Sequence, residues 1–98
     1  MPDNIFDKLI RIIILQGLEC AAGRELSNEL IQRLLKTHSL NRSIAEVNEQ
    51  INWLEQRGYI KTERMGDEGL IKANITRPGI DVALGHTRAE GIDPPYGV

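Results

Sequence analysis

Two asparagines one helical turn apart give this sequence its clearest potential for chemistry. Asn48 and Asn52 lie in the segment "SIAEVNEQINWLEQ", and the amide of an Asn side chain can pair with an adenine edge. Arg42, just before the segment, could reach guanine or a phosphate, and Ser43 is a further outward polar residue. These four residues are candidates for reading bases. The alternative is an ordinary solvated face, because acidic residues of the same segment would sit near phosphates.

Basic residues that follow this segment could contact the phosphate backbone of DNA. Residues 42–77 hold six Lys and Arg, which matches the lower end of a footprint of roughly 6 to 10 phosphates. The same stretch holds six Asp and Glu, so binding requires the two signs to be sorted onto different surfaces. Alternation along "KTER" allows some sorting, because neighbouring residues of a strand point to opposite faces. The phosphate candidates are Arg57, Lys61, Arg64, Lys72 and Arg77.

Catalysis and metal binding have little support in the sequence. His38 and His86 have no Cys or carboxylate at the spacing of metal ligands, and Cys20 has no histidine nearby in sequence. Gly66 and Gly69 belong to a turn signal and do not form a phosphate-binding loop. We therefore expect no enzyme, catalytic residue, metal, cofactor or small-molecule ligand.

The composition predicts one soluble domain in the cytoplasm. A chain of 98 residues can bury one modest core, and a single Cys fits a reducing compartment. No stretch approaches the ~20 apolar residues that a membrane span requires. The net charge of −2 argues weakly against a dedicated nucleic-acid binder, since such proteins are usually basic.

The elements that must position the candidate residues are predicted from periodicity, caps and turns. Helices are expected over 4–19, 27–39, 43–57 and 77–86, and strands over 59–65 and 70–76. Asp3 or Asn4, Ser27, Ser43 and Thr76 are the expected N-caps, and Glu46 completes a capping box with Ser43. The expected inward stripe of the second helix is Leu30, Ile31, Leu34 and Leu35, and Gly58 is the expected stop of the third helix.

The first helix is apolar on nearly all sides in its second half. Ile14, Leu15 and Leu18 lie on the same helical face as Arg11, opposite the main apolar stripe. The helix must therefore be covered from two sides. The fourth helix can cover one side, and we predict a homodimer in which Ile14, Leu15 and Leu18 meet a second copy. The alternative is that the C-terminal tail folds back over them.

The order of elements predicts a mainly α fold with a small β-hairpin, a winged helix-turn-helix (α-α-α-β-β-α). It would occupy residues 1–88, with an irregular Pro- and Gly-containing tail over 89–98. The phrases "WLEQRGYI" and "ITRPGIDVA" resemble the core of winged-helix regulators. The layout "IRIIILQGL", "INWLEQRGYI", "ITRPGIDVALG" and a Pro-rich ending is similar to small proteins of Mu-like prophages, whose function is unassigned.

Two functions from different classes are consistent with these features. The first is a DNA-binding, phage-type regulator of transcription that inserts the third helix into the major groove of double-stranded DNA. The second is a protein-interaction module in phage assembly or host takeover, because one fold can serve many functions. Trp53 lies beside the inward stripe, where it either packs within the domain or anchors a partner.

Overall fold

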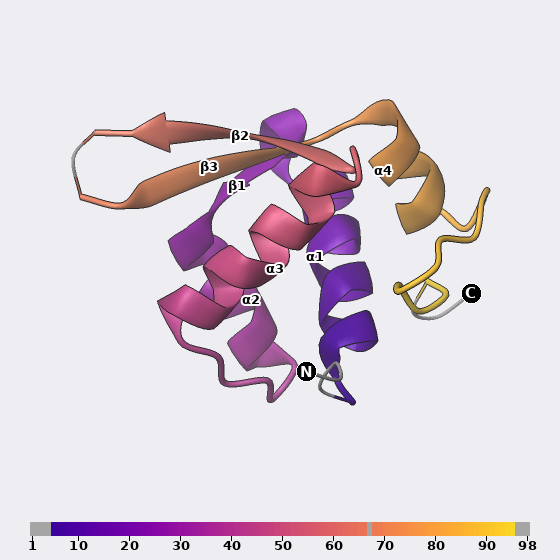
Figure 1. Cartoon of the computed structure of the whole chain (residues 1–98), viewed down its shortest axis with the longest axis horizontal. Helices are drawn as coiled ribbons and strands as arrows, with labels where there is room; N and C mark the ends of the chain where they lie inside the picture. The colour runs from indigo at the N-terminus through magenta and orange to yellow at the C-terminus, as the bar shows by residue number, and fades with distance from the viewer. Residues whose placement is uncertain (1–4, 67, 96–98) are drawn as a thin grey trace.

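The protein is a small, mainly helical domain with a three-stranded antiparallel sheet. The structure is a computed structural model that describes residues 5–66 and 68–95. The elements in chain order are α1 (Asp7–Cys20), the 3-10 turn η1 (Ala22–Arg24), β1 (Glu25–Ser27), α2 (Asn28–Thr37), α3 (Ile44–Gln56), β2 (Ile60–Met65), β3 (Leu70–Ile75) and α4 (Arg77–Ala83). Figure 1 shows the β2–β3 hairpin projecting to one side of the helices. The predicted helices and hairpin are confirmed, and β1 is an additional strand.

Side-chain caps set the first residue of three helices, as predicted. The hydroxyls of Ser27, Ser43 and Thr76 each accept a hydrogen bond from a backbone amide of the first turn. In α3 the carboxylate of Glu46 also accepts the Ser43 N–H at 3.0 Å, so the predicted capping box is present. α1 begins at Asp7, after Phe6, and the predicted caps at residues 3 and 4 lie outside the described residues.

The end of α3 is fixed by a glycine, also as predicted. Gly58 has a φ of +83°, a left-handed conformation that residues with a Cβ adopt at a cost. Its N–H donates to the Glu55 carbonyl at 3.0 Å, and the Tyr59 N–H donates to the Leu54 carbonyl at 3.1 Å. This pair of bonds is the Schellman motif, which closes the helix and turns the chain into β2.

β3 is the central strand of the sheet, with β1 on one side and β2 on the other. Lys72 of β3 therefore stands between Ser27 of β1 and Glu63 of β2. The strand β1 was missed because three residues are too few to show an alternating pattern. Its last residue, Ser27, is also the N-cap of α2, and this helix signal dominates the local sequence.

α1 is the central element of the core and packs against α2, α3, α4, β1 and β3. Ile14, Leu15 and Leu18 are each 0% exposed within the single chain. This corrects the prediction that a second copy covers them, because the chain itself surrounds α1 on both sides. A homodimer stays a prediction with no assigned surface.

α2 buries a narrower stripe than the sequence predicted. Ile31 and Leu35 are fully buried, whereas Leu30 is 49% exposed. Leu34 packs against Gly17 of α1, where an added Cβ would collide with the leucine side chain. The two helices can approach closely because this position has no side chain, and α2 turns its Leu30 edge toward solvent.

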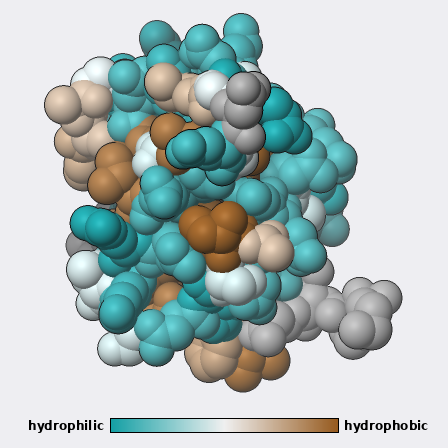
Figure 2. All heavy atoms as spheres, turned by 90° about the vertical axis from the view of Figure 1, so that its left-hand side faces the viewer, coloured by the Kyte–Doolittle hydropathy of each residue, from teal (hydrophilic) through white to brown (hydrophobic). Residues whose placement is uncertain are grey.

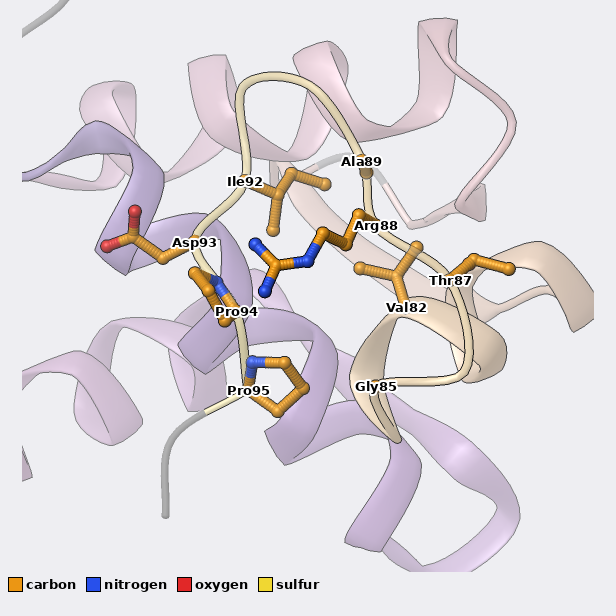
Figure 3. Close-up of a pocket in the computed structure, with 9 residues that line it drawn as sticks. All are labelled: Val82, Gly85, Thr87, Arg88, Ala89, Ile92, Asp93, Pro94 and Pro95. Atoms are coloured by element: carbon orange, nitrogen blue, oxygen red, sulfur yellow. The ribbon is translucent and has the colours of Figure 1, made fainter. Parts of the chain in front are cut away.

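The C-terminal segment packs onto the helices without regular secondary structure. Ile92 joins the core with 7% of its surface exposed, and the Asp93 N–H donates to the Lys8 carbonyl at 3.2 Å. Figure 3 shows residues 85–95 running beside α4, with Ile92 and Val82 facing a common space. Over the described residues, the tail thus folds back onto the N-terminal half of α1, at Lys8 and Arg11, and its predicted cover of Ile14, Leu15 and Leu18 stays a prediction.

Candidate nucleic-acid interface

A groove between α3 and the β2–β3 hairpin brings together three of the predicted site residues. Asn48, Asn52 and Arg64 all line it. Thr62 lines it as well, so the alternation along β2 puts Arg64 on the groove side and Lys61 on the other. The remaining lining residues are Ile51, Glu55, Gly69 and Ile71.

Asn28, which the sequence did not suggest, ties α2 to both walls of this groove. It is 1% exposed and lies in the first turn of α2. Its amide nitrogen donates to Asn48 Oδ1 at 3.0 Å and to the Gly69 carbonyl at 3.2 Å, and its Oδ1 accepts the Ile71 N–H at 3.3 Å. A buried amide with all these partners fixes the hairpin relative to α2 and α3. Its only sequence signal is a polar residue just after an N-cap.

The two asparagines of α3 have different capacities for reading bases. Asn48 is half-buried and its Oδ1 already accepts a hydrogen bond from Asn28, whereas Asn52 is exposed. Bidentate pairing with adenine uses both the amide oxygen and the amide nitrogen. Asn52 is therefore the better placed of the two for reading a base.

Glu55 is an acidic residue inside the groove. Its Oε2 accepts the Thr62 N–H at 3.0 Å and the Thr62 hydroxyl at 2.7 Å. These bonds tie the last turn of α3 to β2. The carboxylate also gives the groove a negative charge near Arg64, so the groove is not uniformly basic.

Ser43 has a structural role that outweighs its candidacy as a base reader. Its hydroxyl accepts the Glu46 N–H at 3.1 Å within the capping box. The pKa of Glu46 lies below its ordinary value, mainly because its carboxylate accepts the backbone N–H of Ser43, and Arg42 adds a smaller attraction. Ser43 and Glu46 therefore determine where α3 starts.

Arg42 lies outside the groove, in a basic region at the corner between α2 and α3. The depression at this corner is lined by Gln32, Arg33, Lys36, Asn41, Arg42 and Ser43. Arg33 and Lys36 were not among the predicted site residues. Their spacing of three residues places them on one face of α2, which is a usable but common signal.

Lys72 is held on the face of the sheet opposite the groove. Its Nζ lies 3.3 Å from Glu63 Oε1 and 3.4 Å from Glu25 Oε2. Glu63, and then Glu25, raise the pKa of Lys72, while Asn74 and Lys72 lower the pKa of Glu25. Lys72 is thus compensated by two carboxylates, and it does not share a surface with Asn52 and Arg64.

Arg57 stacks on Trp53 at the C-terminal end of α3. Its guanidinium lies 3.7 Å from the ring centroid, and Arg11 of α1 lies 3.8 Å from the same centroid. Because one ring face cannot hold both groups at these distances, the two arginines occupy opposite faces. Trp53 thus packs within the domain, which was the first of its two predicted roles. Arg77 is exposed at the start of α4 and is not among the residues that line the groove.

Arg11 is the buried member of this stack and was expected on the outer face of α1. It is 3% exposed, and it donates to Gln50 Oε1 at 2.8 Å and to the Gly91 carbonyl at 3.0 Å. Asp7 Oδ2 lies 4.0 Å away. The sequence could not reveal this burial, because it depends on residues far along the chain.

No model of a known protein family matches the chain, and neither does any protein of curated function. Within residues 5–66 and 68–95, no group of three or more His, Cys, Asp and Glu side chains is arranged to hold a metal ion. In the same residues, each helix is too short or too polar to cross a lipid bilayer.

Proposed function

We propose that this protein is a winged helix-turn-helix domain that binds double-stranded DNA and regulates transcription. In this proposal α2 and α3 form the helix-turn-helix, and the β2–β3 hairpin is the wing. The observation that carries it is the shared groove, in which Asn52 of α3 and Arg64 of the hairpin face the same side. One side chain can read a base while the other contacts a phosphate.

The N-terminal half of α3 would enter the major groove, as in other helix-turn-helix proteins. The exposed stripe that runs from the first turn of α3 to its middle (Ala45, Glu49 and Asn52) would then face the bases. The small side chain of Ala45 allows close approach and can pack against a thymine methyl group. Glu49 can accept a hydrogen bond from cytosine, so an acidic residue on this stripe is compatible with base reading.

The test compares binding of a labelled random-sequence duplex at about 50 mM and 200 mM salt. We expect wild-type affinity to fall steeply between these conditions, because phosphate contacts release counterions. Arg64→Ala should weaken binding to all sequences and reduce the salt slope by about one unit. Lys61→Ala removes the same charge from the other face of β2 and is the matched control.

Base reading is tested separately, on the sequence selected from a random library. Asn52→Ala should relax the preference at one base pair by roughly 1 to 3 kcal/mol and leave the salt slope unchanged. Asn48→Ala should change the preference less, because its amide oxygen already accepts from Asn28. If wild type binds no duplex at about 50 mM salt, the proposed function is wrong.

A protein-interaction module is the second candidate, and the distribution of charge favours it. Lys72 is compensated by Glu25 and Glu63, and Glu55 lies in the groove itself. Against it, Figure 2 shows the side with the hairpin tip as mostly hydrophilic, with separate hydrophobic patches. Stable protein interfaces usually have a larger apolar centre. The DNA assay separates the two candidates.

A further inference from the structure

The corner between α2 and α3 carries three basic residues, which we name the corner cluster: Arg33, Lys36 and Arg42. Arg33 and Lys36 are exposed on the second half of α2, and Arg42 is half-buried two residues before α3. Figure 1 places this corner beside the N-terminal end of α3 and far from α4. The cluster therefore adjoins the half of α3 that a helix-turn-helix uses to read bases.

Hydrogen bonds hold the corner in place. The Gln32 amide nitrogen donates to the Arg42 carbonyl at 2.9 Å, which ties the turn to α2. Arg42 Nη1 donates to the Asn41 carbonyl at 3.0 Å, which orients the guanidinium. A guanidinium has five N–H donors, so Arg42 keeps donors for a further acceptor. These hydrogen bonds already order the turn and the Arg42 side chain, so a ligand would lose less entropy on binding.

The corner cluster differs from the hairpin in how its charge is compensated. Among the described residues that line the corner, none is a carboxylate, although Arg42 also lines a neighbouring depression with Asp7, Glu46 and Glu49. Glu46, the first acidic residue of α3, accepts the backbone N–H of Ser43, and its attraction to Arg42 is the smaller interaction. On the hairpin, by contrast, Lys72 is bridged by Glu25 and Glu63. An anion at the corner would therefore meet positive charge without displacing an existing ion pair.

We propose that the corner cluster is the main electrostatic anchor for DNA, and that it holds backbone phosphates beside the bases read by α3. This inference rests on the proposed function and adds the place where the backbone is held. Phosphate contacts supply most of the sequence-independent affinity and set the orientation of the protein on the duplex. The hairpin then contributes one phosphate contact, from Arg64, and is the minor anchor.

The test measures fluorescence anisotropy of a labelled random duplex of about 20 base pairs between about 50 and 200 mM salt. Arg33→Ala, Lys36→Ala and Arg42→Ala should each lower the salt slope by about one unit and the affinity at 100 mM salt by roughly ten-fold. Arg33→Ala/Lys36→Ala should have a larger effect than Arg64→Ala, and Arg33→Lys/Lys36→Arg should retain most of the binding. Circular dichroism checks that each variant is folded.

Arg77→Ala is the charge-matched control, because it removes a cation from the start of α4. We expect it to change affinity less than two-fold. If Arg33→Ala/Lys36→Ala binds with wild-type affinity and slope, the anchor is elsewhere and the inference is overturned while the proposed function stands. If Arg77→Ala weakens binding equally, net charge and not the corner is responsible, which also overturns it. If wild type binds no duplex at about 50 mM salt, the proposed function and this inference both fail.

Discussion

The basic residues that lie beside the two ends of α3 have different roles. At the C-terminal end, Arg11 and Arg57 stack on Trp53, and Arg11 also holds the C-terminal segment through the Gly91 carbonyl. At the N-terminal end, Arg33 and Lys36 extend into solvent. The first set of cations stabilises the fold, and the second is available to a ligand. An arginine's role here is decided by whether aromatic rings and carbonyls from distant segments surround it.

Arg11→Ala should have the largest effect on stability in this comparison. The variant removes a 3% exposed guanidinium and takes a donor from Gln50 Oε1 and from the Gly91 carbonyl, while Asp7 Oδ1 still accepts from the Gln50 amide at 3.0 Å. We expect the free energy of unfolding to fall by about 3 kcal/mol, because breaking a buried polar cluster strands its partners. Urea denaturation followed by circular dichroism measures it.

Two controls make this prediction specific to burial. Arg57→Ala loses a similar contact with Trp53 from an exposed position, so its cost should be below about 1 kcal/mol. Arg33→Ala/Lys36→Ala, at the other end of α3, should change stability by less than about 0.5 kcal/mol. Equal losses in Arg11→Ala and Arg57→Ala would break the distinction between a buried and an exposed arginine.

Gly91→Ala tests whether the C-terminal segment belongs to the same packed unit. An added Cβ would lie 2.7 Å from the Trp53 ring, and Gly91 has a φ of +85°. Gly58→Ala is a matched control, because its φ is +83° and nothing lies within 4 Å of its added Cβ. Both variants place an alanine at a positive φ, at a similar cost. The collision with Trp53 should therefore make Gly91→Ala less stable than Gly58→Ala by roughly 1 to 3 kcal/mol. Similar values would mean that the segment moves away from Trp53 without loss.

Features encoded by neighbouring residues were predictable, and features made by distant residues were not. Ser43, Glu46 and Gly58 act within a few residues along the chain, so their roles could be inferred from spacing. The burial of Arg11 depends on Gln50 and Gly91, which follow it by 39 and 80 residues. No local pattern contains that information, and an arginine on a helix is usually exposed.

The same distinction between local and distant features applies to the candidate site. The grouping of Thr62 with Arg64 followed from strand alternation. The corner cluster was missed because Arg33 and Lys36 resemble any solvated helix face, and only the α2–α3 turn brings Arg42 beside them. Asn28 was missed because its partners come from α3 and from the hairpin.

Ser43→Ala tests what stabilises the N-terminal end of α3, beside which Arg33 and Lys36 extend into solvent. Loss of the cap should lower the free energy of unfolding by about 1 kcal/mol, because the Glu46 N–H loses its acceptor. Ser43→Thr keeps a hydroxyl and should recover most of that stability. Thermal denaturation of the three proteins measures the difference. If Ser43→Ala matches wild type, the capping box does not determine where α3 begins.

Lys72→Met should give the smallest change, and its dependence on pH identifies the cause. Glu25, whose pKa is lowered by Asn74 and Lys72, contributes stability above the ordinary glutamate pKa of 4.5 and loses it as the pH falls through its depressed value. Lys72, whose pKa is raised by Glu63 and Glu25, contributes stability below the ordinary lysine pKa of 10.5 and loses it as the pH rises through its raised value.

The ion pairs therefore stabilise the fold fully at neutral pH. Wild type should melt slightly above Lys72→Met at pH 7. The gap should close once the pH falls below the lowered pKa of Glu25, and also at high salt, because exposed pairs are weak and screened. A gap that persists under both conditions would mean that the Lys72 side chain stabilises the sheet by packing. The compensation by Glu25 and Glu63, which sets the hairpin apart from the corner cluster, would then have no measurable effect on stability.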